Sequence, residues 1–161
     1  MQAFRIAKTR HIHDLSGIGA MLHGGRWNHK NVPVVYASEN RSLATVEFLV
    51  HVSLSIVPND LSIACLEIPD DIVSEQISMN DLPKNWREYP APPELAKLGS
   101  EWALAKRSLL LRVPSVVVPN EFNILINPRH PGIHTVTISR IERYTFDSRL
   151  LRARKPFERD E

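Results

Sequence analysis

Short runs of β-branched and apolar residues, separated by stretches rich in Gly, Pro, Asn and Asp, restrict this chain to a fold built on short strands. Branched side chains fit a pleated surface, so these runs predict strands. They lie at residues 32–38, 61–68 and 109–118, where Pro114 interrupts the strand, with one or two more between 122 and 146. The region 70–93 is rich in Pro, Asn and Asp and predicts an irregular connection.

Two segments have helical character. One begins where Asn40 or Ser42 can cap a first turn, and the other spans 101–108 behind Ser100. Strands and helices do not alternate regularly along the chain. We therefore expect an α+β fold, a single domain with mixed or antiparallel sheets, and not a doubly wound parallel sheet.

Length and composition agree with one compact domain. The 161 residues suffice for one core, which we expect over about 3–150, with a polar tail at 151–161. Cys65 is the single cysteine, and we find neither a signal peptide nor an apolar membrane-spanning stretch, so we expect a cytoplasmic protein. The net charge of +2 argues against direct nucleic-acid binding.

Glu47 is a carboxylate where the helical pattern calls for an apolar residue. Helical spacing places it on one stripe with Leu43, Val46 and Val50. Burying an ionised carboxylate without a partner is expensive, so Glu47 must be paired, protonated or facing a cleft. A structural carboxylate, satisfied by a backbone amide or by an arginine such as Arg26, is the alternative to a functional one.

The segment Gly24-Gly25-Arg26-Trp27-Asn28 combines a flexible turn, a cation and a large aromatic ring. Glycines allow close approach of the backbone to a ligand, an arginine offers a fork of donors to phosphate, and a tryptophan offers a flat face. That combination suits a nucleotide. Tyr36, on the following strand, can add a second ring and a hydroxyl. A solvated arginine, a core tryptophan and a core tyrosine are the plainer interpretations.

Ser115 lies between Pro114 and Pro119, which predicts a rigid bend. No G-x-S-x-G motif surrounds it, so binding or positioning is a better role for it than nucleophilic attack. The scattered histidines and the single cysteine provide no set of metal ligands, and we expect no metal. The G-x-G of residues 17–19 follows no strand and lacks the third glycine of a Rossmann fingerprint.

Three stretches, taken in order, resemble the RES domain family, named for its Arg, Glu and Ser. They are "SGIGAMLHGGRWNHKNVPVVYASENRSLATVEFLVH", then "LPKNWREYPAPPELAKLGSEWALAKRSLLLRVPSVVVPNEFNILINPRHPG", then "FDSRLL". The resemblance covers nearly the whole chain. It implies a fold similar to that of ADP-ribosyltransferases and the role of a toxin in a bacterial toxin–antitoxin module. It also implies NAD as the substrate, either degraded or used to transfer ADP-ribose.

The resemblance also implies roles for individual residues. Arg26 would bind the phosphates of NAD, Tyr36 would hold the nicotinamide end, and Glu47 would act at the ribose. Ser115 would complete the nicotinamide or ribose contacts. Trp27 would cover the dinucleotide or pack beneath it, and Asn127, in the downstream Asn-Pro, would join the substrate-binding residues. One departure is the sequence His-Lys-Asn after Asn28, which lacks an expected glycine.

The acceptor of ADP-ribose is left open by the sequence. Inorganic phosphate would make the chain an NAD phosphorylase, water an NAD glycohydrolase, and a side chain a protein ADP-ribosyltransferase. A non-catalytic nucleotide-binding module is a further alternative. The candidates for a phosphate-binding cation are Arg107, Arg112 and Arg129.

A toxin of this family implies a cognate antitoxin, Xre-like with a helix-turn-helix half, that blocks the active site. Arg26 and Arg41 flank the expected entrance in the sequence, and a cationic entrance would attract an antitoxin carboxylate. Self-association into a homo-oligomer is compatible with the sequence.

Overall fold

The computed structural model describes residues 1–52 and 58–151, so residues 152–161 of the expected tail lie outside the described part. Its centre is one seven-stranded sheet with strand order β4-β5-β6-β2-β1-β3-β7, in which only β4 and β5 pair in parallel. The strands are β1 (Gln2–Lys8), β2 (Val35–Ser38), β3 (Leu61–Glu67), β4 (Ser74–Gln76), β5 (Leu110–Pro114), β6 (Phe122–Ile126) and β7 (Thr137–Tyr144). The expected α+β fold with a mixed sheet is confirmed.

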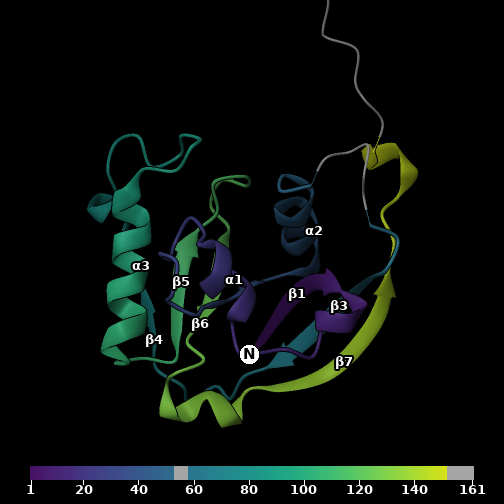
Figure 1. The fold of residues 1–161 in the computed structure, drawn as a ribbon, viewed down its shortest axis with the longest axis horizontal. Coiled ribbons are helices and arrows are strands. Elements are labelled where there is room, and N and C mark those ends of the chain that lie inside the picture. The colour runs from purple at the N-terminus through teal and green to yellow at the C-terminus, as the bar shows by residue number, and fades with distance from the viewer. Residues whose placement is uncertain (53–57, 152–161) are drawn as a thin grey trace, which may run out of the picture.

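Within residues 1–52 and 58–151, three α-helices accompany the sheet: α1 (Ile18–His23), α2 (Arg41–Leu49) and α3 (Pro93–Ala105). Figure 1 shows α3 beside β4 and β5, at one end of the sheet, and α2 over β1. Short 3-10 turns occur at Thr9–His11, Met79–Asp81, Pro131–Thr135 and Ser148–Leu151. In the part of the chain described, no helix has the length and apolar character needed to cross a membrane.

The sheet consists of two blocks that meet at one residue pair. β1 pairs with β3 at seven positions, and β2 pairs with β6 at four. Between β1 and β2, in contrast, only Phe4 and Ser38 are paired. Because β2 ends at Ser38, the two strands part on one side of this pair, between residues 5–7 of β1 and 35–37 of β2. α2, which contacts both β1 and β2, lies across the junction. We call β4-β5-β6-β2 the inner block and β1-β3-β7 the outer block.

Two apolar cores stabilise these blocks. The larger core includes residues from both blocks, namely Ala3, Ala64, Leu66, Ile124 and Ile126. The second core lies between α3 and the inner block and contains all three tryptophans of the chain: Trp27, Trp86 and Trp102, packed with Leu95 and Leu125. Trp27 is thus a core residue, 3% exposed.

Local signals predicted α2 well. Asn40 caps the helix, since its side chain accepts a 2.7 Å hydrogen bond from the Leu43 N–H, and Ser42 lies inside the helix. The strand expected at 32–38 begins only at Val35, and the connection expected at 70–93 contains β4.

The second helix was predicted at 101–108 with Ser100 as its cap, and both predicted ends were wrong. α3 begins at Pro93, because proline is well tolerated in the first turn of a helix, where its missing N–H removes no hydrogen bond. It ends at Ala105, before Lys106 in a left-handed conformation. Ser100 lies inside α3, and its Oγ accepts a 2.8 Å hydrogen bond from the His29 N–H.

We expect Gly99→Ala to destabilise the fold by about 3 kcal/mol or more, because overpacking against a rigid neighbour is expensive. A Cβ at Gly99 would lie 2.0 Å from the carbonyl oxygen of Trp27, so α3 would have to move off the Gly24–Asn28 turn. Chemical denaturation measures the change in the free energy of unfolding.

Gly19→Ala is the matched control. No atom lies within 4 Å of a Cβ at Gly19, and alanine favours a helix over glycine by about 1 kcal/mol. A Gly99→Ala protein as stable as the Gly19→Ala protein would contradict the close packing of α3 on the turn.

Candidate active site

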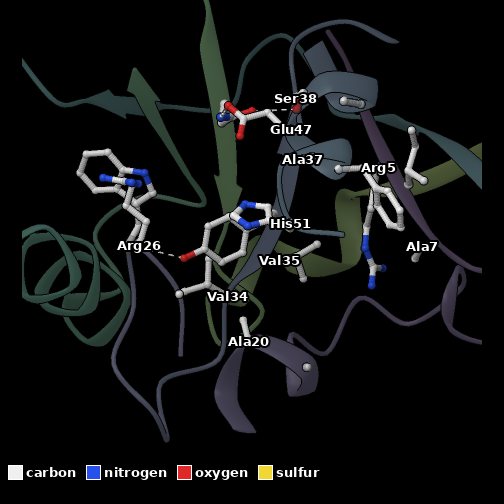
Figure 2. A pocket seen from close by; sticks show the side chains of 18 of the residues that line it. Arg5, Ala7, Ala20, Arg26, Val34, Val35, Ala37, Ser38, Glu47 and His51 are labelled. Atoms are coloured by element: carbon white, nitrogen blue, oxygen red, sulfur yellow. Dashed lines mark hydrogen bonds between the residues drawn. The ribbon is translucent and has the colours of Figure 1, made fainter. Parts of the chain in front are cut away.

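A pocket of about 520 Å³ opens where β1 and β2 part. One wall is β1, from Phe4 to Ala7, and the other is β2 with the loop and turn that precede it. α2 closes one end through Glu47 and Phe48. Figure 2 shows Glu47, Arg26 and Arg5 approaching the same hollow from three sides.

The wall opposite β1 is a tight turn that only glycine permits. Gly25 and Asn28 exchange backbone hydrogen bonds of 2.9 and 3.4 Å across the turn. A Cβ at Gly25 would lie 2.7 Å from the Tyr36 hydroxyl oxygen, so no larger residue fits. Asn28 is buried, and its Nδ2 donates to the carbonyls of Ala20 and Val32 at 2.9 and 3.0 Å.

Tyr36 stabilises this turn through hydrogen bonds and also lines the pocket. Its hydroxyl donates to Asn28 Oδ1 at 2.7 Å and accepts from the Trp27 N–H at 3.1 Å. Burial raises the pKa of Tyr36, although the Trp27 N–H and the Arg26 charge oppose the shift. The hydroxyl is therefore protonated at neutral pH and acts as a donor, not as a base.

Arg26 points from the turn toward the pocket with its guanidinium already oriented. Its two terminal nitrogens donate to the backbone carbonyls of Trp86 at 2.7 Å and Glu88 at 3.2 Å. Part of its five-donor fork is left for a ligand. Burial lowers the pKa of Arg26, and the nearby charge of Glu47 opposes this shift. The guanidinium is therefore partly desolvated before any ligand arrives.

Glu47 is held by two side chains of the inner block. Ser115 Oγ and Asn123 Nδ2 both donate to Oε1, at 2.7 and 2.6 Å. Neither a backbone amide nor Arg26 is its partner, in contrast to the structural alternative considered from the sequence. Within residues 1–52 and 58–151, no protein group donates to Oε2. Within the described part of the chain, the second carboxylate oxygen therefore has no donor and can accept a hydrogen bond from a ligand.

Both donors to Glu47 are themselves fixed. Ser115 is buried in the bend after β5, and its Oγ accepts from the N–H groups of Val117 and Val118 at 3.1 and 2.9 Å. Its one hydroxyl hydrogen therefore goes to Glu47. Asn123 Oδ1 accepts a 2.7 Å hydrogen bond from Ser38 Oγ, which fixes the orientation of its amide.

The other residues predicted from the sequence have different surroundings. Trp27 borders the pocket from the core. Asn127 is buried outside the pocket, where its Nδ2 donates to the Ala103 carbonyl at 2.8 Å and its Oδ1 accepts from the Arg129 N–H at 3.0 Å. Arg41 does not flank the pocket, because its guanidinium pairs with Glu142 at 2.7 Å.

The three arginines considered for phosphate binding do not line the pocket either. Arg107 pairs with Glu75 at 3.2 Å, and Arg112 pairs with Glu39. Arg129 is exposed beyond β6.

The pocket residues that were not selected from the sequence include Arg5, His51 and Asn123. The Arg5 guanidinium donates to the Asp14 carbonyl, and burial lowers the pKa of Arg5, opposed by the Asp14 charge. His51 lies one helical turn after Glu47, a spacing that could have drawn attention to it. Asn123 carries no local signal in its strand. Among the described residues, no cluster of three or more His, Cys, Asp or Glu is placed to hold a metal.

Comparisons with known proteins match this chain over most of its length. The RES domain family matches residues 2–147. A protein of Sphingobium sp. (strain YBL2) named "Prs ADP-ribosylating toxin" is 38% identical over 148 residues, 91% of this chain and 92% of that protein. A "Toxin Res" of Yersinia enterocolitica is 38% identical over 153 residues, 93% of this chain and 99% of that protein.

A solved structure has a similar fold. It is a chain in the crystal structure of the M. tuberculosis MbcT–MbcA toxin–antitoxin complex, with a TM-score of 0.67. The similarity covers 89% of this chain and 84% of that chain, at 15% sequence identity. At this identity the comparison supports the fold alone.

We expect Tyr36→Phe to lower the free energy of unfolding by about 1–3 kcal/mol, because it leaves the Trp27 N–H and Asn28 Oδ1 without a partner in buried surroundings. Chemical denaturation measures this loss. Tyr89→Phe removes the same hydroxyl from a residue that is 91% exposed, and should change stability by less than about 0.5 kcal/mol. Equal losses in the two variants would contradict the stabilising role of Tyr36.

Proposed function

Because the chain belongs to the RES domain family, we propose that it is the toxin of a bacterial toxin–antitoxin module and that it consumes NAD in the pocket between β1 and β2. The names of the relatives from Sphingobium and Yersinia support the toxin role. The residues around the pocket support a dinucleotide substrate that is cleaved at the nicotinamide–ribose bond.

The arrangement of Glu47 is the observation that carries this proposal. Oε1 is fixed by Ser115 and Asn123, whereas Oε2 has no donor among the described residues and belongs to a residue that lines the pocket. Such a carboxylate is oriented in advance for a ribose hydroxyl and for positive charge that develops on the sugar. Ser115 then contributes by positioning Glu47.

Two arginines on opposite walls suit the diphosphate. Arg26 is oriented by the Trp86 and Glu88 carbonyls, and Arg5 by the Asp14 carbonyl. Both retain donors, and a guanidinium fork matches the geometry of phosphate oxygens. Between these walls the ring of Tyr36 provides a surface for the nicotinamide end, with Trp27 packed behind it.

The chemistry needs only one carboxylate. When the bond between ribose C1′ and the nicotinamide nitrogen breaks, its electron pair stays with the nicotinamide, which leaves as a neutral molecule and needs no general acid. The ribose gains oxocarbenium character, as in glycoside cleavage. An ionised Glu47 stabilises this charge and orients the ribose, and the acceptor then bonds to C1′ and loses a proton.

The acceptor defines two versions of this function. With inorganic phosphate or water as the acceptor, the chain would be an NAD phosphorylase or an NAD glycohydrolase. For either reaction the substrate pocket alone is sufficient. Transfer to a protein is the second candidate, favoured by the name of the Sphingobium relative. The products formed from NAD identify the acceptor. ADP-ribose 1″-phosphate formed only when phosphate is added would indicate phosphate, free ADP-ribose would indicate water, and labelled protein in a bacterial lysate would indicate a side chain.

We expect the purified chain to release nicotinamide from NAD with a chelator present, and Glu47→Gln to reduce kcat by about 100-fold or more. The amide can still accept hydrogen bonds from Ser115 and Asn123 through its oxygen, so the fold and the position of the side chain are kept. Nicotinamide release, followed by chromatography, gives the rate, and thermal melting checks the fold.

Glu101→Gln, at an exposed position on α3, is the control for loss of a carboxylate. Normal turnover in Glu47→Gln with only a changed melting temperature would make Glu47 structural. NAD binding without nicotinamide release in the wild-type chain would favour the non-catalytic nucleotide-binding module instead.

We also propose that a cognate antitoxin, Xre-like as the family resemblance implies, covers the pocket. Ile18 and Leu22 are 48% and 58% exposed on α1, the helix whose Gly19 and Ala20 line the pocket. An apolar surface beside a cationic opening suits a protein partner that brings a carboxylate.

Expression of the chain alone should therefore arrest bacterial growth and lower cellular NAD, and the antitoxin complex should release no nicotinamide. Growth curves, NAD measurement and the assay on the purified complex test both points. A harmless wild-type chain would overturn the toxin role, and a complex as active as the free chain would overturn the blocking of the pocket.

A further inference from the structure

α2 is attached to both blocks of the sheet, and the two attachments lie on opposite sides of the helix. Glu47 faces the pocket and binds Ser115 and Asn123 of the inner block. Thr45 contacts Tyr144, at the end of β7 in the outer block. Successive side chains of a helix are rotated by about 100° around its axis. Thr45 and Glu47 are two positions apart, so their side chains point in nearly opposite directions.

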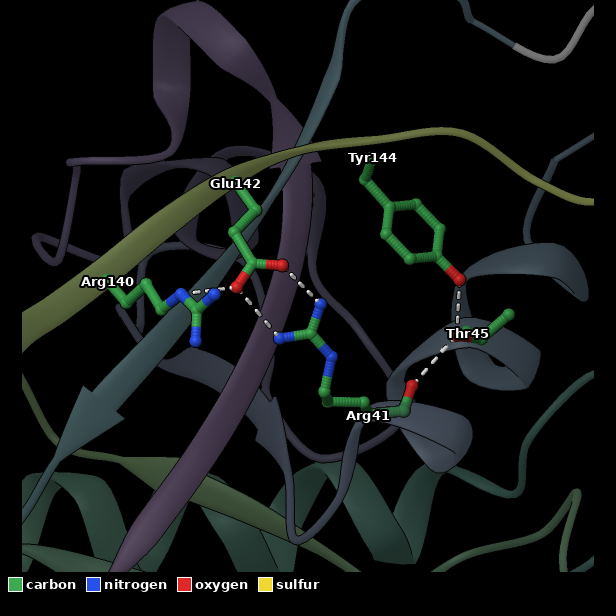
Figure 3. Close-up of polar contacts among 5 residues, drawn as sticks. All are labelled: Arg41, Thr45, Arg140, Glu142 and Tyr144. Carbon is green, nitrogen blue, oxygen red and sulfur yellow. Dashed lines mark hydrogen bonds and ion pairs between the residues drawn. The ribbon is translucent and has the colours of Figure 1, made fainter.

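The contact between Thr45 and Tyr144 has a defined direction. Thr45 Oγ1 lies 2.6 Å from the Tyr144 hydroxyl oxygen and also donates to the Arg41 carbonyl at 2.8 Å (Figure 3). Since the threonine hydrogen is used for Arg41, the Tyr144 hydroxyl is the donor to Thr45. This hydrogen bond therefore fixes the side of α2 that faces away from the pocket.

The ring of Tyr144 is itself held in place. It packs edge-on against Phe146 with ring centroids 5.2 Å apart, and Phe146 packs against Phe48 of α2 at 5.8 Å. Phe48 lines the pocket beside Glu47. The aromatic contacts and the hydrogen bond thus act on the same turn of the helix.

A neighbouring ion pair contributes less to the orientation. Arg41 binds both carboxylate oxygens of Glu142, at 2.7 and 3.4 Å, and Arg140 binds the same carboxylate at 2.5 Å (Figure 3). The Arg41 and Glu142 side chains are 45% and 31% exposed, and exposed pairs contribute little to stability. This pair holds the first turn of α2, whereas the Tyr144–Thr45 bond is nearer to Glu47.

We propose that Tyr144, acting through Thr45, is a positioning residue that sets the rotation of α2 and so the placement of the Glu47 carboxylate in the pocket. A helix of nine residues has little stability of its own and takes its orientation from its tertiary contacts. Small displacements of a group that acts on the reacting centre lower the rate more than they lower substrate binding. The inference rests on the proposed cleavage of NAD by Glu47.

The test uses Tyr144→Phe, Thr45→Val and the double variant in the nicotinamide-release assay. Each single variant should lower kcat roughly tenfold while KM for NAD stays within about twofold. The double variant should be no slower than either single variant, because all three lose the same hydrogen bond. Thr45→Ser keeps the hydroxyl, so its kcat should be close to that of the wild type. Tyr144→Phe keeps the aromatic packing, so the fold is retained.

Thr9→Val is the matched control. Thr9, in the turn after β1, forms another hydroxyl pair: its Oγ1 lies 2.9 Å from Ser62 Oγ of β3. Among the described residues, the hydrogen bonds of this hydroxyl go to Ser62 and the Asp60 carbonyl and not to α2. The kcat of Thr9→Val should equal that of the wild type. An unchanged kcat in Tyr144→Phe and Thr45→Val, or an equal loss in Thr9→Val, overturns the positioning role. A wild-type chain that releases no nicotinamide overturns the proposed function instead, so the two failures are distinguishable.

Discussion

The single pairing of Phe4 with Ser38 determines the architecture of this protein. A fully paired β1–β2 ladder would close the sheet and leave no room between the strands. Because the strands part on one side of this pair, the pocket has residues of both blocks as its walls, and α2 lies across them. The carboxylate of Glu47 is consequently carried by a helix that contacts both blocks and is hydrogen-bonded to both.

Hydrogen bonds among buried polar groups stabilise the pocket walls. The Tyr36 hydroxyl donates to Asn28 Oδ1 and accepts from the Trp27 N–H, so it joins both side and main chain of the Gly24–Asn28 turn. Gly25 leaves room for this hydroxyl, because a Cβ there would lie 2.7 Å from it. The carbonyls that orient Arg26 come from the loop before α3, whose Gly99 packs on the same turn. Donors held in position before a ligand binds need little reorganisation during the reaction, which is the physical basis for the proposed catalysis.

Features that depend on neighbouring residues in the chain were predictable from the sequence. The Asn40 cap, the turn that holds Arg26 and the anomalous carboxylate of Glu47 all follow from local spacing. Features that depend on distant residues were not: the partners of Glu47 come from β5–β6, nearly seventy residues or more away, and Asn123 looks like any polar residue of a strand. Asn127 was selected from the sequence through the resemblance to the family, whereas in the structure its side chain donates to the Ala103 carbonyl of α3.

The structure of the Glu47→Gln protein with bound NAD tests the central claim most directly, because this variant should bind the dinucleotide without cleaving it. The account predicts NAD in the pocket between β1 and β2, with its diphosphate hydrogen-bonded to Arg26 and the ribose of its nicotinamide end in contact with residue 47. NAD bound at another surface, or bound in this pocket with that ribose far from residue 47, would contradict it.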